Sequence, residues 1–224
     1  MSENFIIHNL SFIIQMTVVS LDALVSGARA GKLVSFPTDT VPAIASLPEK
    51  SSLIYAAKQR SREKPLILMA ARADEVWAFT RGSDEEYAIW REVATQYWPG
   101  ALTLVLPASE LVPRVMISSS DRDANEYANQ LSHSATVGIR IPDRAIARKI
   151  LAQTGPLATT SINLSGQPPL LTVSEIEAQF PDILSLAATE YDTELQGTGL
   201  PSTVAKWTGE NWQVLRQGAI KIDQ

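Results

Sequence analysis

TVGIRIPDRAIARKILAQTGPLATTS, residues 136–161, is the stretch that decides the fold class. Residues 136–141 and 157–161 predict two strands, and residues 145–153 between them predict a helix that ends at Gly155. A strand, a helix and a second strand in succession are typical of α/β proteins. We therefore expect a sheet with helices packed on it.

The rest of the chain alternates helices and strands in the same way. Ser20 caps a predicted helix that Gly31 closes. Further helices are predicted at residues 52–59, 87–97 and 174–180, and further strands at residues 33–36, 66–70, 102–106, 203–207 and 212–215. Residues 118–134 predict a mobile surface loop, and the acidic segment that ends at Glu194 predicts little strand. Since no repeat or long linker is visible, we expect one α/β domain with a mixed sheet covered by helices.

Composition excludes several kinds of active site. The 224 residues include no Cys and only two His, His8 and His133, which argues against disulfides, thiolate nucleophiles, zinc sites and histidine-based triads. The lack of Cys also suits a reducing cytoplasm. No apolar run reaches the length of a membrane span. Residues 1–15 lack the basic start and cleavage site of a signal peptide, so we expect a disordered or over-extended leader before a domain at residues 16–224.

Charge is distributed unevenly along the chain. The net charge of -5 argues against a protein that coats nucleic acid. Residues 31–72 nevertheless hold seven cations and three acidic residues, a local charge of +4. Four of these cations, Lys58, Arg60, Arg62 and Lys64, fall within seven positions before a predicted strand. They can converge on the phosphates of a nucleotide, but they equally suit the negative end of a helix dipole, so the run alone leaves both interpretations open.

Three more polar clusters lie at the ends of predicted strands or in the loops after them: Pro37-Thr38-Asp39-Thr40, Ser161-Ile162-Asn163-Leu164-Ser165-Gly166 and Pro201-Ser202-Thr203. Strand ends are where open α/β sheets bind ligands, although each cluster also fits an ordinary polar turn. Thr136 and Arg140 flank a strand and fit ordinary strand and edge positions. No P-loop or dinucleotide-binding fingerprint occurs. A site built from these residues would align reactants and neutralise charge with hydroxyls, one amide, backbone groups and cations.

In sequence order, these clusters resemble the YrdC/Sua5 family of threonylcarbamoyl-AMP synthases, in its short, single-domain form, from about residue 21 to residue 220. Any one motif is weak, but seven in order are hard to explain by chance. The motifs are Phe36-Pro37-Thr38-Asp39-Thr40-Val41, Lys58-x-Arg60 with Lys64-Pro65-Leu66, Trp98-Pro99-Gly100-Ala101-Leu102-Thr103, Val137-Gly138-Ile139-Arg140-Ile141-Pro142, Ser161-x-Asn163-x-Ser165-Gly166, Ser202-Thr203-Val204 and Leu215-Arg216-Gln217-Gly218.

The resemblance implies a nucleotidyltransferase that condenses L-threonine, bicarbonate and ATP into threonylcarbamoyl-adenylate and pyrophosphate. Mg²⁺ would come with the ATP phosphates, without a metal site of the protein's own, and the product would pass to the transferase machinery that modifies adenosine 37 of tRNA. The implied fold is a twisted sheet with a concave groove. The implied residues are Lys58, Arg60 and Lys64 for catalysis, Arg60, Lys64, Thr136, Ser161, Asn163 and Arg216 for ATP, and Thr40, Arg140 and Ser202 for threonine.

The chain departs from the family pattern at three places. It reads Pro42-Ala43-Ile44 where members commonly have Tyr-Gly-Leu, Met69 where some have His, and Ile162 where Ala is usual. Two alternatives therefore stay open: a YrdC-like paralogue with another adenylation or carbamoylation substrate, and a module that binds double-stranded RNA. The acidic net charge weighs against RNA binding beyond a weak contact.

Overall fold

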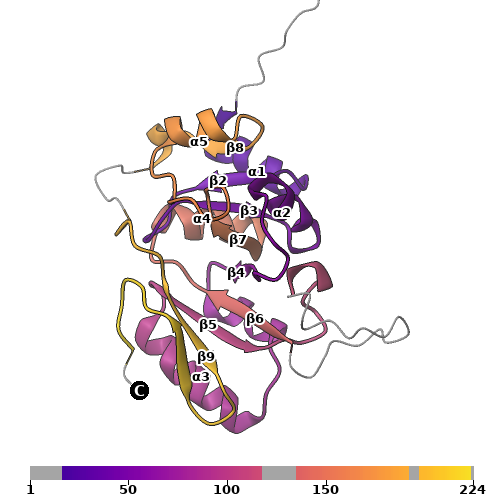
Figure 1. Ribbon diagram of the computed structural model, residues 1–224, viewed down its shortest axis with the longest axis vertical. Coiled ribbons are helices and arrows are strands. Elements are labelled where there is room, and N and C mark those ends of the chain that lie inside the picture. The colour runs from indigo at the N-terminus through magenta and orange to yellow at the C-terminus, as the bar shows by residue number, and fades with distance from the viewer. Residues whose placement is uncertain (1–16, 118–134, 192–196, 223–224) are drawn as a thin grey trace, which may run out of the picture.

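The computed structural model describes residues 17–117, 135–191 and 197–222. Ten strands of this part of the chain form one mixed sheet in the order β1-β8-β2-β3-β7-β4-β6-β5-β9-β10, which runs along the long axis of the molecule (Figure 1). The strands are β1 (Val18–Val19), β2 (Val34–Phe36), β3 (Ala43–Ser46), β4 (Ile67–Met69), β5 (Leu102–Pro107), β6 (Thr136–Arg140), β7 (Leu157–Ser161), β8 (Leu184–Leu186), β9 (Thr203–Trp207) and β10 (Trp212–Arg216).

Five α-helices belong to the same described residues. They are α1 (Leu21–Arg29), α2 (Ser52–Lys58), α3 (Asp84–Tyr97), α4 (Ala145–Thr154) and α5 (Val173–Gln179). Short 3-10 helices are η1 (Pro48–Lys50), η2 (Ala73–Glu75), η3 (Trp77–Phe79), η4 (Arg114–Met116) and η6 (Ala188–Glu190). None of these helices is both long enough and apolar enough to cross a bilayer.

Side-chain caps explain where two of the helices begin. The Ser20 hydroxyl accepts a hydrogen bond from the Ala23 amide at the start of α1. At the start of α3, the Ser83 hydroxyl accepts from the Glu86 amide and the Glu86 carboxylate accepts from the Ser83 amide, which forms a capping box. This box sets the start of α3 three residues before the apolar periodicity that predicts the helix.

Strand β7 brings distant segments of the chain together. It pairs antiparallel with β3 on one side and with β4 on the other. The register sets Ala43 opposite Ser161 and Ile67 opposite Thr159. The end of β7 therefore lies beside the start of β3 and near the start of β4, which follows the basic run.

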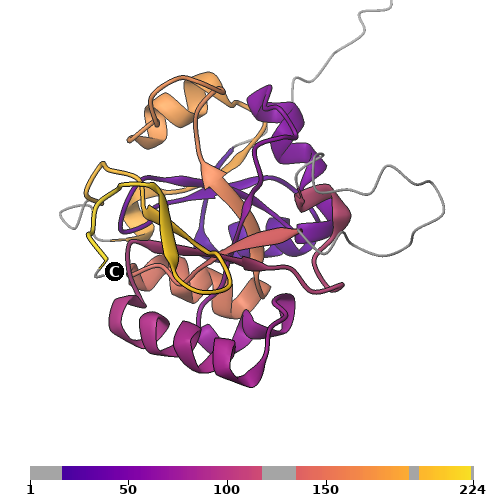
Figure 2. The same ribbon diagram turned by 60° about the horizontal axis from the view of Figure 1, so that its bottom comes forward.

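Helices pack on both sides of the sheet, as Figure 2 shows. One buried cluster joins α1 and α4 to one face, with Leu24, Val25 and Ile150 against Val34 and Phe36. A second cluster joins α2, α3 and α5 to the other strand positions, and its members include Ile54, Trp90, Ile176, Leu68 and Leu104. Alternate residues of the central strands thus enter different clusters, as the pleat of a sheet buried on both faces requires.

The structure confirms the predicted α/β class and the predicted helices and strands, with boundaries shifted by up to three residues. It corrects one prediction, because β8 lies in the acidic segment that predicted little strand. A strand of three residues is too short to show an alternating pattern. Strands β1 and β3 also lacked a sequence signal. The predicted leader at residues 1–15 and the predicted loop at residues 118–134 lie outside the described residues.

Candidate active site

A small cavity of about 70 Å³ lies where five of the predicted site residues meet. These residues are Thr40, Arg140, Ser161, Ser202 and Arg216. They come from the turn after β2, the last positions of β6, β7 and β10, and the residue before β9. Five segments that are far apart in the sequence therefore supply side chains to one place. We call this cavity the small cavity.

Arg140 is held in the wall of the small cavity by three hydrogen bonds. It is only 4% exposed, and its guanidinium donates to Asp39 Oδ1 at 2.7 Å, to Thr40 Oγ1 at 2.9 Å and to the Gly100 carbonyl at 3.0 Å. Burial lowers the pKa of Arg140, and the Asp39 carboxylate opposes that shift. An Arg side chain has five N–H donors, so within the described part of the chain two remain for a ligand anion. Its orientation is thus fixed before any ligand binds.

The turn at residues 37–40 is itself fixed by hydroxyl contacts. Thr38 Oγ1 donates to the Val41 carbonyl at 2.7 Å and accepts from the Thr40 amide at 3.2 Å. The two threonine hydroxyls lie 3.0 Å apart. Thr38 makes the local turn that the sequence predicts, and Thr40 is left to face the cavity and Arg140. The turn interpretation and the site interpretation are therefore compatible.

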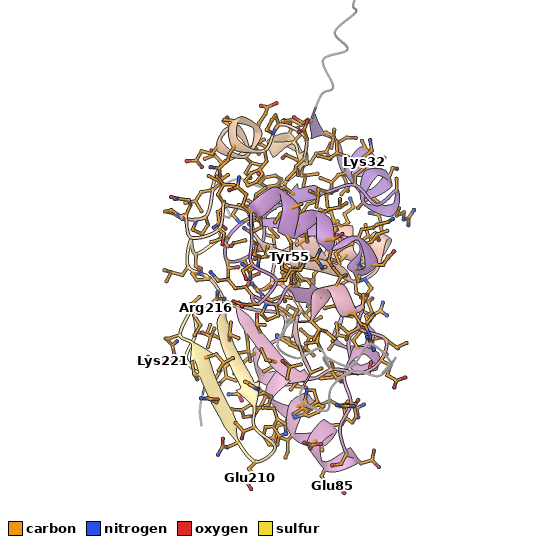
Figure 3. The ribbon with its side chains drawn as sticks, turned by 45° about the vertical axis from the view of Figure 1, so that its right-hand side comes forward. Lys32, Tyr55, Glu85, Glu210, Arg216 and Lys221 are labelled. Atoms are coloured by element: carbon orange, nitrogen blue, oxygen red, sulfur yellow. The ribbon has the colours of Figure 1, made fainter. Side chains whose placement is uncertain are left out.

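Ser202 and Arg216 form the opposite wall. Arg216 donates to the Ser202 carbonyl at 2.8 and 3.1 Å, and the Ser202 hydroxyl lies 2.9 Å from Thr103 Oγ1. Figure 3 shows Arg216 at the end of the β9–β10 hairpin that faces the middle of the molecule, with Glu210 at the far tip. The hairpin therefore presents its cation to the cavity and its acidic turn to solvent.

Lys58 connects the basic run to the loop after β7. It is 1% exposed, and its ammonium donates to the Ser161 carbonyl, to the Asn163 carbonyl at 2.6 Å and to Asn163 Oδ1 at 3.0 Å. The Lys58 carbonyl in turn accepts from the Ser165 amide at 3.0 Å. Three acceptors match the three donors of an ammonium group, so Lys58 holds this loop in place. Burial, and then the nearby Arg60 charge, lower its pKa to about 7.

Ser161 and Asn163 are also tied to each other. The Ser161 hydroxyl donates to Asn163 Oδ1 at 2.7 Å, and Asn163 Nδ2 donates to the carbonyls of Leu164 and Gln167 at 2.7 Å. The side-chain amide of Asn163 is thus used within the loop. Ser161 alone of the two lines the small cavity.

The other cations lie around this loop at different depths. Arg60 is half-buried and donates to the carbonyls of Lys64 and Pro65, both at 3.1 Å. Lys64 is exposed, and Thr136 is half-buried at the start of β6. Neither Lys64 nor Thr136 is among the residues that line the small cavity. Their predicted contacts with phosphate stay predictions.

Positive charge gathers around the small cavity. Partial burial lowers the pKa of Arg216, and the charges of Arg140 and then Arg60 lower it further. Arg216 is therefore close enough to both of the other guanidinium groups to be repelled by them. Asp39 offsets one of them through its ion pair with Arg140. Such a field attracts and stabilises an anionic ligand.

The remaining wall of the small cavity is more apolar. Val41, Ala43, Ile67 and Met69 line it together with the hydroxyls of Thr159 and Thr160. Among the described residues, no group of three or more His, Cys, Asp or Glu side chains could hold a metal ion. The arrangement can bind a small molecule that carries an anionic group and an apolar part.

Comparison with protein families identifies the family. The model of the Sua5/YciO/YrdC family, whose description is telomere recombination, matches residues 27–218. This chain belongs to that family. The match covers every described strand except β1.

Relatives within the Sua5/YciO/YrdC family carry one recurring name. The threonylcarbamoyl-AMP synthase of Pyrococcus abyssi is 32% identical over 200 residues, which is 88% of this chain and 53% of the relative. The threonylcarbamoyl-AMP synthase of Vibrio parahaemolyticus is 29% identical over 205 residues, which is 89% of this chain and 99% of the relative. The chain thus spans about half the length of the first relative and nearly all of the second.

Solved structures of family members share the fold. The P. abyssi Sua5 structure complexed with L-threonine has a TM-score of 0.70 and 29% identity over 88% of this chain and 54% of that chain. Escherichia coli YciO has a TM-score of 0.68 at 21% identity, which shows the common fold.

Sequence reasoning missed residues that support the predicted ones. Asp39 belongs to a predicted polar cluster and a family motif but was given no role of its own, yet it pairs with Arg140 at 2.7 Å. Gly100 holds the same side chain through its carbonyl, and a Cβ at this position would lie 2.4 Å from the Tyr97 carbonyl oxygen. The Trp98-Pro99-Gly100 motif was the available signal for this support, but only the folded structure shows which residue it positions.

Proposed function

We propose that this protein is an L-threonylcarbamoyladenylate synthase, a nucleotidyltransferase that consumes L-threonine, bicarbonate and ATP. The observation that carries the proposal is the convergence of Thr40, Arg140, Ser161, Ser202 and Arg216 on one cationic cavity. The family and the names of its members point to the same reaction.

The reaction suits a site without a protein nucleophile. The threonine nitrogen forms a bond to the bicarbonate carbon, and water leaves to give a carbamate. A carbamate oxygen then forms a bond to the α-phosphorus of ATP, while the bond from that phosphorus to the bridging oxygen breaks and pyrophosphate leaves. The protein aligns three substrates and stabilises the negative charge on carboxylate and phosphate oxygens, which fixed cations and hydroxyls can do.

The geometry suggests a division of roles. The two remaining donors of Arg140 would bind the threonine carboxylate as a fork, with Thr40 and Ser202 on either side. Arg60 and Lys64 would bind the phosphates next to the loop that Lys58 holds. Arg216 would stabilise the charge on the nucleotide. Lys58 would contribute its positive charge and hold Ser161 in position.

Metal chemistry would enter with the nucleotide. Mg²⁺ binds ATP phosphates and water more readily than it strips off its hydration shell for a protein site. The metal would neutralise the pyrophosphate that leaves.

A second candidate is the same chemistry on a different amine. The departures from the family pattern at Ala43 and Met69 support it, because both residues line the small cavity. A double-stranded RNA-binding module is disfavoured by the net charge of -5. If the protein is the proposed synthase, it works in the cytoplasm and its product goes to the tRNA-modifying transferase.

Pyrophosphate release from ATP tests the proposal directly. We expect release that requires both L-threonine and bicarbonate, with threonylcarbamoyl-AMP detected by mass spectrometry. Release that is stimulated more by another amino acid than by threonine would support the second candidate. If no pyrophosphate is released under any of these conditions, both proposed enzyme functions are excluded.

A further inference from the structure

A second cavity, the large cavity, adjoins the turn at residues 37–40. Its volume is about 520 Å³, within the range of small-molecule sites. It shares Thr38 and Thr40 with the small cavity, and Thr40 is the only predicted site residue on its wall. Its other walls come from β2, β8, the start of α5 and residues 197–199.

Two buried hydroxyls on this wall have no hydrogen-bond partner within the described part of the protein. Ser35 and Ser185 are each 2% exposed, and the Oγ atom of each is unpaired. They are partners in the register of the parallel strands β2 and β8, so their side chains stand next to each other on one face. A buried hydroxyl without a partner costs about 1–3 kcal/mol. A ligand group that donates to one serine and accepts from the other would satisfy both.

The rest of the wall indicates the class of ligand. The apolar side chains of Val173 and Ile176, which lie three positions apart on α5, line the cavity, and none of its lining residues within the described ranges is Asp or Glu. The one cation among its described lining residues, Arg144, lies over the ring of Tyr191 at 5.8 Å. An ionised carboxylate at the serine pair would need a cation of its own, whereas a neutral amide needs only one donor and one acceptor.

We propose that the large cavity is a separate binding site for a small neutral molecule that presents an amide edge on an apolar body. The carbonyl of the amide accepts from one serine hydroxyl and its N–H donates to the other. The apolar body packs against Val173 and Ile176. This site does not depend on the synthase proposal, because none of the cations assigned to the substrates lines it.

Saturation-transfer NMR on the full chain tests the site, with benzamide as the probe and benzoate as its charged match. We expect benzamide to bind with a Kd on the order of 1 mM, as a small fragment can, and benzoate to bind at least tenfold more weakly. The double variant Ser35→Ala/Ser185→Ala should lose benzamide binding by at least tenfold. Its melting temperature without ligand should stay the same or rise, because the removed hydroxyls lack partners.

Ser174→Ala is the matched control, because Ser174 lines the same cavity but is exposed. It should bind benzamide as the wild type does. Absence of benzamide binding to the wild type, or equal binding by the double variant, would overturn the proposal. Displacement of benzamide by ATP with threonine would also overturn it, because the cavity would then belong to the substrate site.

Discussion

Replacing Lys58 by Met tests the link between the basic run and the loop after β7. Met fills a similar volume but cannot donate a hydrogen bond. The carbonyls of Ser161 and Asn163 and the Asn163 side-chain oxygen would lose a common donor. The loop that presents Ser161 to the small cavity should therefore lose its position.

The expected loss of stability follows from these contacts. Hydrogen bonds to a charged group contribute about 1.5–3 kcal/mol each. The Met variant loses three such bonds, but it also avoids the desolvation cost of a buried ammonium, which offsets part of the loss. We expect a net loss of about 3 kcal/mol in the free energy of unfolding at pH 6, where most of the Lys58 amine is protonated. For a protein of this size that corresponds to a fall in Tm of about 6–12 °C.

Activity should fall in a way that identifies the role of Lys58. If Lys58 positions the loop, kcat for pyrophosphate release drops more than tenfold while KM for ATP changes little. If Lys58 binds phosphate directly, KM for ATP rises and depends less on salt concentration. Lys50→Met, at an exposed lysine, is the control and should change neither stability nor rate. A Lys58→Met variant with wild-type Tm and kcat would refute this reasoning.

The pH dependence of stability gives an independent check on Lys58. Its pKa is lowered from 10.5 to about 7 in the folded protein by burial and by Arg60. Between these two values the unfolded chain binds more protons, so the wild type should gain stability relative to Lys58→Met as pH rises from about 7 to about 10. Chemical denaturation at a series of pH values measures this. If the difference in free energy of unfolding between the wild type and Lys58→Met does not change with pH, the lowered pKa is contradicted.

The remaining predictions concern the cations and their support. Arg60→Ala should abolish most pyrophosphate release without changing Tm by more than about 4 °C, whereas Arg62→Ala, at an exposed side chain over the Tyr55 ring, should keep wild-type rates. Arg140→Gln should raise the threonine concentration that gives half-maximal rate more than tenfold. Calorimetry should show weaker threonine binding and unchanged ATP binding. Gly100→Ala should lower Tm and weaken threonine binding together, because the new Cβ collides with a backbone oxygen and shifts the carbonyl that holds Arg140; equal threonine affinity would contradict it.

Local sequence signals predicted most of the elements, and the reasons for the failures are physical. The helix after Ser20 was predictable because its cap and its apolar spacing are both local. Strand β3 was not, because residues 43–46 are all buried and show no alternation. The small cavity could be anticipated only by treating several weak motifs together. The pairing of Asp39 with Arg140, 101 positions apart, has no local signal at all.

The position of β7 between β3 and β4 has a consequence for how the chain is made. During synthesis, β3 and β4 leave the ribosome long before residues 157–161, so each has an open edge until β7 inserts between them. The edge strand β1 stays unpaired for longer still, since its partner β8 begins at Leu184. Nascent chains stalled before Leu157 should therefore be prone to aggregation and should engage chaperones, whereas chains released after β10, which also closes the β5 edge with β9, should fold cooperatively.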